Sequence, residues 1–279
     1  MKIAVTAANG QLGGEIIKAC IKLVGKENII GLARTPSKAE HLPVEIRPGD
    51  YNRQQELRQS LNAVDTVLLV SSNDQPDNRI HQHRNVINAA QSAGATKIVF
   101  TSIQGPEMSG SFAPIVQSSR QTEADIRHSD MDWVIGRNGI YIEPDLESID
   151  EYKKAGAVHN CAGTGKCGYT TRPELATAYS HMLTEKQHNG QTFNLHGQTI
   201  TQQQLVDYMN DKFRTHLVYH SISEQQFRED RINALGPFLG GIIAGIYSGI
   251  RDGYFDNPSQ FDKAAGRMHQ QWRDYFQPD

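Results

Sequence analysis

Small residues close to the N-terminus have the types and spacing of a turn that binds phosphate. A short apolar run leads into Ala7, Gly10 and Gly13, which occupy the three positions of a G-x-x-G-x-x-G pattern, and an amphipathic helical pattern follows. The unpaired N–H groups at the start of such a helix, with the positive end of its dipole, form an anion site. At the first strand–helix turn of an open parallel sheet, the expected anion is the pyrophosphate of a dinucleotide.

Alanine in the first of these positions departs from the pattern. Ala7 fits there only if its φ is below zero, because a positive φ favours glycine. Gly10 and Gly13 remain available for the close approach of the backbone to phosphate and for tight packing of the helix on the strand. The alternative is an ordinary strand–helix turn that holds no ligand.

Two basic residues after the second apolar run bear on which dinucleotide is bound. A carboxylate just past this strand would accept a hydrogen bond from the ribose 2′-hydroxyl and select NAD. Arg34 occupies the position instead, and Lys38 follows one helical turn later. Two cations suit a 2′-phosphate, for which Arg offers a planar fork. We therefore expect NADP(H) to be preferred over NAD(H); the alternative is two solvated surface cations.

Polar side chains also follow the next expected strands. Asp50 could accept from the adenine amino group while Tyr51 supplies an apolar edge, but Asp is equally a strong N-cap residue for the next helix. Because the carboxyl ends of parallel strands meet at one edge of a sheet, the hydroxyl side chains at the two following strand ends would line a polar crevice for the cofactor. These residues are Ser71, Ser72, Thr101 and Ser102.

The elements that must position these residues are visible as an alternation of apolar runs and helical patterns. Continuous β-branched runs separated by helices indicate an α/β fold with a doubly wound parallel sheet, buried on both faces. We interpret residues 1–140 as a Rossmann-like NADP-binding domain and 141–279 as a smaller, mainly helical lobe on the substrate side, with the chain crossing back near 169–195. The expected strands are 3–5, 29–32, 44–46, 66–70, 98–100, 133–135 and 192–195, and the expected helices are 12–24, 54–61, 85–93, 117–126, 173–183, 202–213 and 223–234.

Composition excludes several classes of protein. A chain of 279 residues with 38% hydrophobic and 21% charged residues is globular. Its net charge of −3 gives no electrostatic case for nucleic acid. The longest apolar stretch, 234–250, is too short and too interrupted by glycine and proline to span a bilayer, so no membrane contact is expected. Gly241, Gly245 and Gly249 would share one helix face there, which favours helix packing over contact with a flat ligand.

Cysteine and histidine give little sign of metal chemistry. Three cysteines without a C-x-x-C, and no leader before the first strand, favour a reduced, cytoplasmic protein. His159 lies close to Cys161 and Cys167, but no fourth ligand has a suitable spacing, so no metal is expected. His81 and His83 do not share a helix face, and we expect them at the helix surface or the edge of the crevice.

Several segments together resemble a known family. The chain is similar to the NmrA-like family of atypical short-chain dehydrogenases and, within it, to the branch of bacterial NAD(P)H:quinone oxidoreductases and triphenylmethane reductases. The match covers the chain to about residue 200 and weakens beyond it. It rests on the segments VTAANGQLGG, LARTPSK, GDYN, LLVSS, HQHRNVINAAQSAGATKIVFTS, WVIGRNGIY, GTGKCGYTTRPELA and GQTFNLHG, in that order.

This resemblance implies a Rossmann-like NADP domain with a small C-terminal domain. It places the pyrophosphate against residues 7–12, the 2′-phosphate against Arg34 and Lys38, and the nicotinamide end against 138–142. The four hydroxyl residues at the strand ends would line the ribose and the nicotinamide. Together with the arguments above, it assigns to the cofactor Thr6, Ala7, Ala8, Asn9, Gly10, Gln11, Leu12, Arg34, Lys38, Asp50, Tyr51, Ser71, Ser72, Thr101, Ser102, Asn138 and Gly139.

The helix after the fifth strand departs from the wider superfamily. Ordinary short-chain dehydrogenases carry Tyr-x-x-x-Lys there, in which Tyr gives a proton to the carbonyl while Lys lowers its pKa and holds the ribose. The stretch from Ile115 to Glu123 contains neither residue, and Ser119 stands where several relatives have histidine. The lysine of the related phenylpropanoid reductases is missing too, and Ala7 replaces the glycine usual in this branch. Cofactor binding should survive these changes, whereas carbonyl or alcohol chemistry through the usual acid is in doubt.

A quinone needs less help than a ketone, because its ring accepts hydride readily and the resulting phenolate is aromatic. Placing the dihydronicotinamide against the ring would then be sufficient. Protons would come from water or from Tyr141, whose alternative role is packing, and Asn138 would donate to the developing oxyanion. We therefore expect an NADPH-dependent oxidoreductase that passes hydride directly, without flavin, to a quinone or a similar conjugated, electron-poor aromatic acceptor.

A non-catalytic NADP-sensing regulator that acts through a protein partner is the alternative function. The family contains such regulators, and the loss of the catalytic tyrosine fits them equally well. An enzyme needs an open, partly apolar pocket beside the nicotinamide, whereas a sensor can have that pocket filled. Reduction of dyes or imines, with the same hydride geometry, is a third alternative. The sequence leaves the oligomeric state open, a homodimer included.

Overall fold

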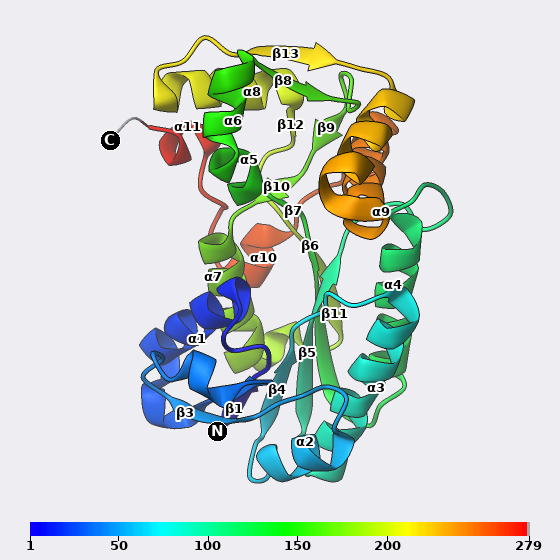
Figure 1. Cartoon of the computed structure of the whole chain (residues 1–279). Helices are drawn as coiled ribbons and strands as arrows, with labels where there is room; N and C mark the ends of the chain where they lie inside the picture. The colour runs from blue at the N-terminus through cyan, green and yellow to red at the C-terminus, as the bar shows by residue number, and fades with distance from the viewer. Residues whose placement is uncertain (278–279) are drawn as a thin grey trace.

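A parallel β-sheet forms the centre of the larger domain in the computed structural model, which describes residues 1–277 (Figure 1). Within that range the sheet has seven strands in the order β11-β6-β5-β4-β1-β2-β3, and each pair of neighbours is parallel. The predicted doubly wound α/β fold is therefore confirmed. The strands are β1 (Ile3–Val5), β2 (Ile29–Ala33), β3 (Glu45–Pro48), β4 (Thr66–Leu69), β5 (Lys97–Ile103), β6 (Asp132–Asn138) and β11 (Gln191–Leu195).

Helices cover both faces of this sheet, which is why its central strands are apolar along their whole length. On one face, α1 (Gln11–Val24) packs against α7 (Arg172–Thr184), and α7 in turn packs against α10 (Phe261–Ala265), over a first apolar core. On the other face, a second core lies beneath α2 (Gln54–Ser60), α3 (Pro76–Ser92) and α4 (Ala113–Arg127). Short 3-10 helices, η1 (Lys26–Asn28), η2 (Pro36–Ala39) and η3 (Lys186–His188), join the elements.

A smaller lobe with its own apolar core lies beyond the carboxyl ends of the strands, in the upper part of Figure 1. The chain enters it after β6, returns to the sheet for α7 and β11, and enters it again. The lobe is built mainly from helices, as expected, together with small two-stranded sheets. Its elements are β7 (Ile140–Tyr141), α5 (Glu143–Glu147), α6 (Ile149–Ala155), β8 (Ala157–Asn160), β9 (Lys166–Cys167), β10 (Tyr169–Thr170), β12 (Ile200–Thr201), α8 (Gln202–Phe213), β13 (Val218–Ser221), α9 (Glu224–Arg251) and α11 (Trp272–Tyr275).

The long helix α9 is the one helix of residues 1–277 whose length and apolar composition would suit a membrane span. It is interrupted at Gly236, where φ is +79°, and Pro237 follows directly. Beyond the kink it packs into the protein: a Cβ at Gly245 would lie 2.5 Å from the backbone N of Phe112. A Cβ at Gly249 would lie 2.9 Å from Phe255, so these two glycines serve helix packing, as expected.

Helix α3 is longer than its sequence pattern predicts. It begins at Pro76, with proline in the first turn, rather than near residue 85. Its first turns bury polar side chains, among them Arg79, Gln82 and His83. Apolar periodicity cannot reveal such a face, because the buried side chains are hydrogen-bonded rather than hydrophobic.

Candidate active site

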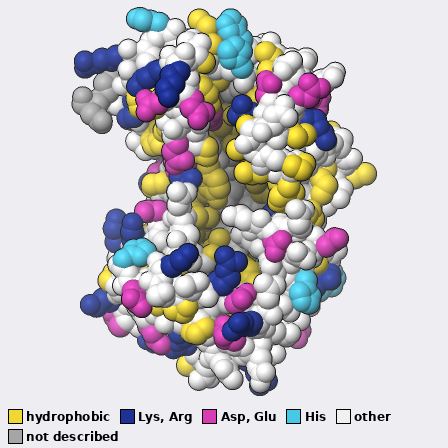
Figure 2. All heavy atoms as spheres, in the orientation of Figure 1, with side chains coloured by type: hydrophobic (Ala, Val, Ile, Leu, Met, Phe, Trp, Pro, Cys, Tyr) yellow, Lys and Arg dark blue, Asp and Glu magenta, His cyan; other side chains and the backbone are white. Residues whose placement is uncertain are grey.

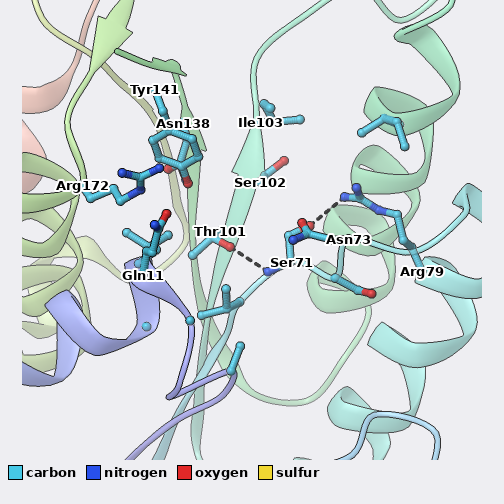
Figure 3. A pocket seen from close by; sticks show the side chains of 17 residues that line it. Gln11, Ser71, Asn73, Arg79, Thr101, Ser102, Ile103, Asn138, Tyr141 and Arg172 are labelled. Atoms are coloured by element: carbon cyan, nitrogen blue, oxygen red, sulfur yellow. Dashed lines mark hydrogen bonds between the residues drawn. The ribbon is translucent and has the colours of Figure 1, made fainter. Parts of the chain in front are cut away.

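Two connected cavities lie along the carboxyl edge of the sheet. One, of about 480 Å³, is bordered by the ends of β2 and β3. The other, of about 400 Å³, extends from the start of α1 across the ends of β4, β5 and β6 to the smaller lobe (Figure 3). The residues that border both are Ala7, Gly10, Ser71, Ser72 and Asn73. Two adjoining cavities along the carboxyl edge of a parallel sheet lie where folds of this class bind a dinucleotide.

The turn between β1 and α1 adopts a conformation that the sequence argument excluded. Ala7 has a φ of +49°, so the expected negative φ is wrong. The turn is tight: the Gly10 N–H donates to Ala7 O over 2.9 Å, and a Cβ at Gly13 would fall 2.4 Å from the same oxygen. Helix α1 then begins at Gln11, without a side chain that caps its N–H groups. These groups remain free for an anion.

Three residues assigned to the cofactor border neither cavity. Thr6 is fully buried, and its hydroxyl accepts from the Val70 N–H at 2.9 Å and from the Tyr51 hydroxyl at 2.5 Å. Ala8 is buried beside it, and its N–H donates to β2. Gly139 packs on backbone, since a Cβ there would lie 2.2 Å from Gly168 O. These three positions therefore support the residues that line the cleft and do not line it themselves.

The two cations assigned to the 2′-phosphate border the outer cavity. Arg34 follows β2 and Lys38 lies in η2, and both side chains are exposed. Asp50 and Tyr51 border the same cavity. The N-cap of α2 is Arg53, so the alternative that Asp50 caps this helix is wrong. Instead, Asp50 Oδ1 accepts from the N–H and the side-chain amide of Asn52.

Hydroxyl groups at the ends of β4 and β5 fix the middle of the cleft. Thr101 Oγ1 accepts from the Ser71 N–H at 2.8 Å (Figure 3), and Ser72 Oγ donates to Gln82 Oε1 at 2.5 Å. Ser102 donates to the fully buried carboxylate of Glu123 at 2.7 Å. All four predicted hydroxyl residues border the inner cavity, and hydrogen bonds within the protein hold them in place.

His83 has a structural role that its sequence context does not indicate. This residue is fully buried rather than at a surface or crevice edge, so that expectation is wrong. Its Nε2 accepts from the Ser72 N–H at 2.9 Å, which leaves Nδ1 to donate to Thr122 Oγ1 at 2.8 Å. Burial, with the charge of Arg79, lowers the pKa of His83 to about 3. The neutral ring therefore holds the Ser71–Ser72 segment in place.

Glu123 is the centre of a buried ionic cluster behind Ser102. Arg137 of β6 contacts both carboxylate oxygens, at 2.9 and 2.7 Å, and Arg120 Nη1 donates at 2.8 Å. Burial alone would raise the pKa of Glu123, but its bonds with these arginines lower it below the ordinary value. Such a fully paired carboxylate fixes the end of β5 relative to β6 and α4.

The predicted pair Asn138 and Tyr141 lies at the inner end of the cleft, beside the smaller lobe (Figure 3). Asn138 Nδ2 donates to Tyr141 Oη at 3.2 Å, while its Oδ1 accepts from the buried Tyr179 hydroxyl at 2.7 Å. Tyr179 thereby decides which way the amide points and keeps its N–H groups on the cavity side. Burial raises the pKa of Tyr141 to about 12, so its phenol stays protonated.

Two arginines border the inner cavity from opposite sides (Figure 3). Arg172, at the start of α7, lies with its guanidinium carbon 5.6 Å from the ring centre of Tyr141. Arg79, from α3, is 6% exposed and donates to the Ser71 hydroxyl at 2.7 Å. The sequence offered one signal for Arg79: a cation on the helix that directly follows the Ser71–Asn73 strand end.

The arrangement can bind a dinucleotide and place a ring beside hydrogen-bond donors. The free N–H groups of α1, the outer cations and the inner amide and phenol follow one another along the cleft. Cys161 and Cys167 are buried, and among residues 1–277 no three His, Cys, Asp or Glu side chains come together as metal ligands.

Comparison with known proteins agrees with this geometry. A family model described as NAD(P)H-binding matches residues 7–185. Quinone oxidoreductase 2 of Escherichia coli is 32% identical over 229 residues, which cover 81% of this chain and 79% of the relative. An NmrA-like family domain-containing oxidoreductase of Aspergillus flavus is 25% identical over 235 residues, 81% of this chain and 76% of the relative.

Solved structures give the same result over nearly the whole chain. The E. coli quinone oxidoreductase complexed with NADPH superposes with a TM-score of 0.90 at 28% identity, covering 98% of each chain. The Citrobacter sp. triphenylmethane reductase complexed with NADP(H) superposes with a TM-score of 0.89 at 31% identity, again covering 98% of each chain. The chain therefore belongs to the NAD(P)H-binding, NmrA-like family.

Proposed function

We propose that this protein is an NADPH-dependent oxidoreductase that passes hydride directly, without flavin, to a quinone or a similar conjugated, electron-poor acceptor. The observation that carries the proposal is the open inner cavity of about 400 Å³ at the nicotinamide end of the cleft, where Asn138 and Tyr141 meet. The names of two relatives, a quinone oxidoreductase and a triphenylmethane reductase, agree with acceptors of this kind.

The cleft fits NADPH at each of its charged parts. The uncapped start of α1 suits the pyrophosphate. Arg34 and Lys38 border the outer cavity and suit a 2′-phosphate. Bound there, NADPH would supply hydride from its dihydronicotinamide ring. The residues at the inner end then need only orient the acceptor and stabilise the charge that it gains.

Asn138 is the residue best placed to stabilise that charge. Its amide oxygen contacts the Tyr179 hydroxyl, which also lies 3.0 Å from Gly136 O, and its Nδ2 group lies toward Tyr141 and the cavity. A donor fixed in this way needs no reorientation when a quinone oxygen becomes a phenolate. Tyr141 remains protonated, because burial raises its pKa to about 12, and can donate a second hydrogen bond or a proton.

The walls of the cleft suit an aromatic ring. Ile103 and Ile115 border the inner cavity, and Ile115 belongs to the helix that carries a catalytic tyrosine in ordinary short-chain dehydrogenases. Figure 2 shows hydrophobic side chains along the hollow between the sheet domain and the smaller lobe. Such a surface favours a flat, apolar acceptor over a sugar or another polar alcohol.

The open cavity also weighs against the sensor alternative. A regulator that only reports the redox state of its nucleotide has no need of free space beside the nicotinamide. Here the space is bordered by fixed donors on one side and apolar side chains on another. The enzyme is therefore the better explanation of the site.

The direct test is turnover of a small quinone. Purified protein is mixed with NADPH and 1,4-naphthoquinone, and the loss of dihydronicotinamide absorbance is followed. We expect steady turnover, and Asn138→Ala should lower kcat about tenfold to a hundredfold, as for a lost oxyanion donor. NADPH affinity should change little, because the pyrophosphate and 2′-phosphate contacts lie elsewhere.

A second variant tests whether the position of the Asn138 amide affects kcat when the amide itself is still present. Tyr179→Phe removes the hydroxyl that contacts Asn138 Oδ1 and Gly136 O, so it should lower kcat by a smaller factor and leave the NADPH Kd unchanged. Tight NADPH binding without turnover of any quinone would contradict the enzyme and favour the sensor.

A further inference from the structure

Arg79 is a buried cation without a counter-charge. Its side chain is 6% exposed, and its two side-chain hydrogen bonds both come from Nη2, to the neutral hydroxyls of Ser71 at 2.7 Å and Ser119 at 3.1 Å. Nε is buried and has no partner, and no carboxylate of the described residues pairs with the guanidinium. Burial lowers the pKa of Arg79 to about 10, so it still carries its charge at neutral pH.

Two other buried ions in this protein are neutralised. Glu123 lies among arginines, and Glu174 pairs with Arg267 at 2.7 Å. Because an isolated buried charge is costly, proteins pair such groups or leave them for a ligand. Arg79 borders the inner cavity, so the missing partner can arrive there.

The inner cavity as a whole is positive. None of the residues that border it is acidic, and two are arginines. Figure 3 shows Arg79 and Arg172 on opposite sides of the space. Arg172 is only loosely paired, with carboxylate oxygens of Glu147 and Glu143 at 3.6 and 4.0 Å. An anion in this space would meet attraction and no acidic neighbour.

The phosphates of the coenzyme do not account for this charge. The pyrophosphate belongs at the start of α1, near Gln11, which lies across the cavity from Arg79 (Figure 3). The 2′-phosphate belongs with Arg34 and Lys38 in the outer cavity. The inner cavity therefore has a cation left over after the coenzyme is placed.

We propose that Arg79 forms an anion subsite for the acceptor, and that the preferred acceptors are quinones that carry an ionised substituent, such as a carboxylate, a sulfonate or an ionised hydroxyl, beside the reacting ring. This inference rests on the proposed function for its chemistry. NADPH, the quinone and one proton give NADP⁺ and the hydroquinone: hydride adds to the quinone, an electron pair moves onto a quinone oxygen, and a proton completes the second hydroxyl. Arg79 pairs with the substituent and so orients the ring.

The test compares two acceptors that differ in one charged group. The kcat/KM for 1,4-naphthoquinone-2-sulfonate is divided by that for 1,4-naphthoquinone, which removes variant effects common to both. Arg79→Met should lower this ratio by at least about tenfold, the scale of a charge-assisted hydrogen bond. Arg79→Lys should keep part of the ratio. Arg84→Gln, on the same helix but exposed and paired with Asp125, is the matched control and should keep all of it.

Two further measurements make the outcome decisive. The NADPH Kd of Arg79→Met should stay within about twofold of wild type; a large rise in this Kd with an unchanged acceptor ratio would mean that Arg79 serves the coenzyme, and would overturn the proposal. Naphthalene-2-sulfonate, which cannot be reduced, is titrated into the NADP⁺ complex. If it binds in an Arg79-dependent way while no quinone is turned over, the subsite stands and the proposed function fails. If its affinity is the same in wild type and Arg79→Met, the subsite is wrong.

Discussion

The strained turn at Ala7 predicts that glycine at this position stabilises the protein. With φ at +49°, the alanine Cβ is held in the left-handed region. That conformation costs an L-residue about 1–2 kcal/mol, which glycine does not pay. Glycine also makes the unfolded chain more flexible than alanine does, and this lowers the free energy of unfolding by about 0.4–1 kcal/mol. Ala7→Gly should therefore raise the free energy of unfolding by about 0.5–1 kcal/mol, or the Tm by about 1–3 °C in a chain of this size.

The assay is thermal unfolding of the variant with and without saturating NADP⁺, beside two controls. Ala63 has a φ of +59° and is exposed away from the cleft, so Ala63→Gly should stabilise to a similar degree. Ala8 is buried, and its φ is not positive, so Ala8→Gly should destabilise by about 0.5–1 kcal/mol. A loss of stability in Ala7→Gly that matches Ala8→Gly would refute the conformation of this turn.

Two other expectations concern charge. Arg34→Asp should weaken NADPH binding by about 1.5–3 kcal/mol while sparing NADH, measured by calorimetry with both coenzymes; equal loss for both would contradict the 2′-phosphate assignment. The pKa of His83 is lowered to about 3 in the folded protein, whereas in the unfolded chain the imidazole has its ordinary pKa near 6.5. Between these two pH values the unfolded chain binds a proton that the folded protein does not. The free energy of unfolding should therefore fall as the pH drops from about 6.5 toward 3. In His83→Gln, the free energy of unfolding measured in urea should depend less on pH over that window. The slope should differ from that of wild type by up to about 1.4 kcal/mol per pH unit. If the wild-type and variant free energies follow parallel curves against pH, His83 is not a buried neutral imidazole.

The sequence predicts those parts of the fold that depend on residues close together in the chain. The continuous apolar runs at β1, β2 and β4 mark strands buried on both faces. The hydroxyl residues that follow β4 and those that end β5 lie at one edge of the sheet because parallel strands share a direction. The inner cavity does bring Ser71, Thr101 and Asn138 together. The cofactor roles of these residues, the cytoplasmic location and a homodimer stay predictions.

The parts that sequence could not predict depend on contacts between distant segments. The φ of Ala7 follows from the close packing of α1 on the turn, and nothing in the residue type indicates it. The polar buried face of α3 holds Arg79 and His83 through partners on α4, and this removes the apolar signal from its first turns. Tyr179, which lies on α7 and 41 residues beyond Asn138, contacts its amide, and spacing alone cannot reveal this pairing.

The return of the chain to the sheet has a consequence for protein engineering. Helix α7 contributes to the core beneath α1, and β11 pairs with β6 along the full length from Gln191 to Leu195. A fragment cut after β6 would therefore expose an apolar face and an unpaired strand edge. Exchange of the smaller lobe between relatives must replace two separate stretches of chain and keep α7 and β11 with the host, because a single crossover would divide the nucleotide domain itself.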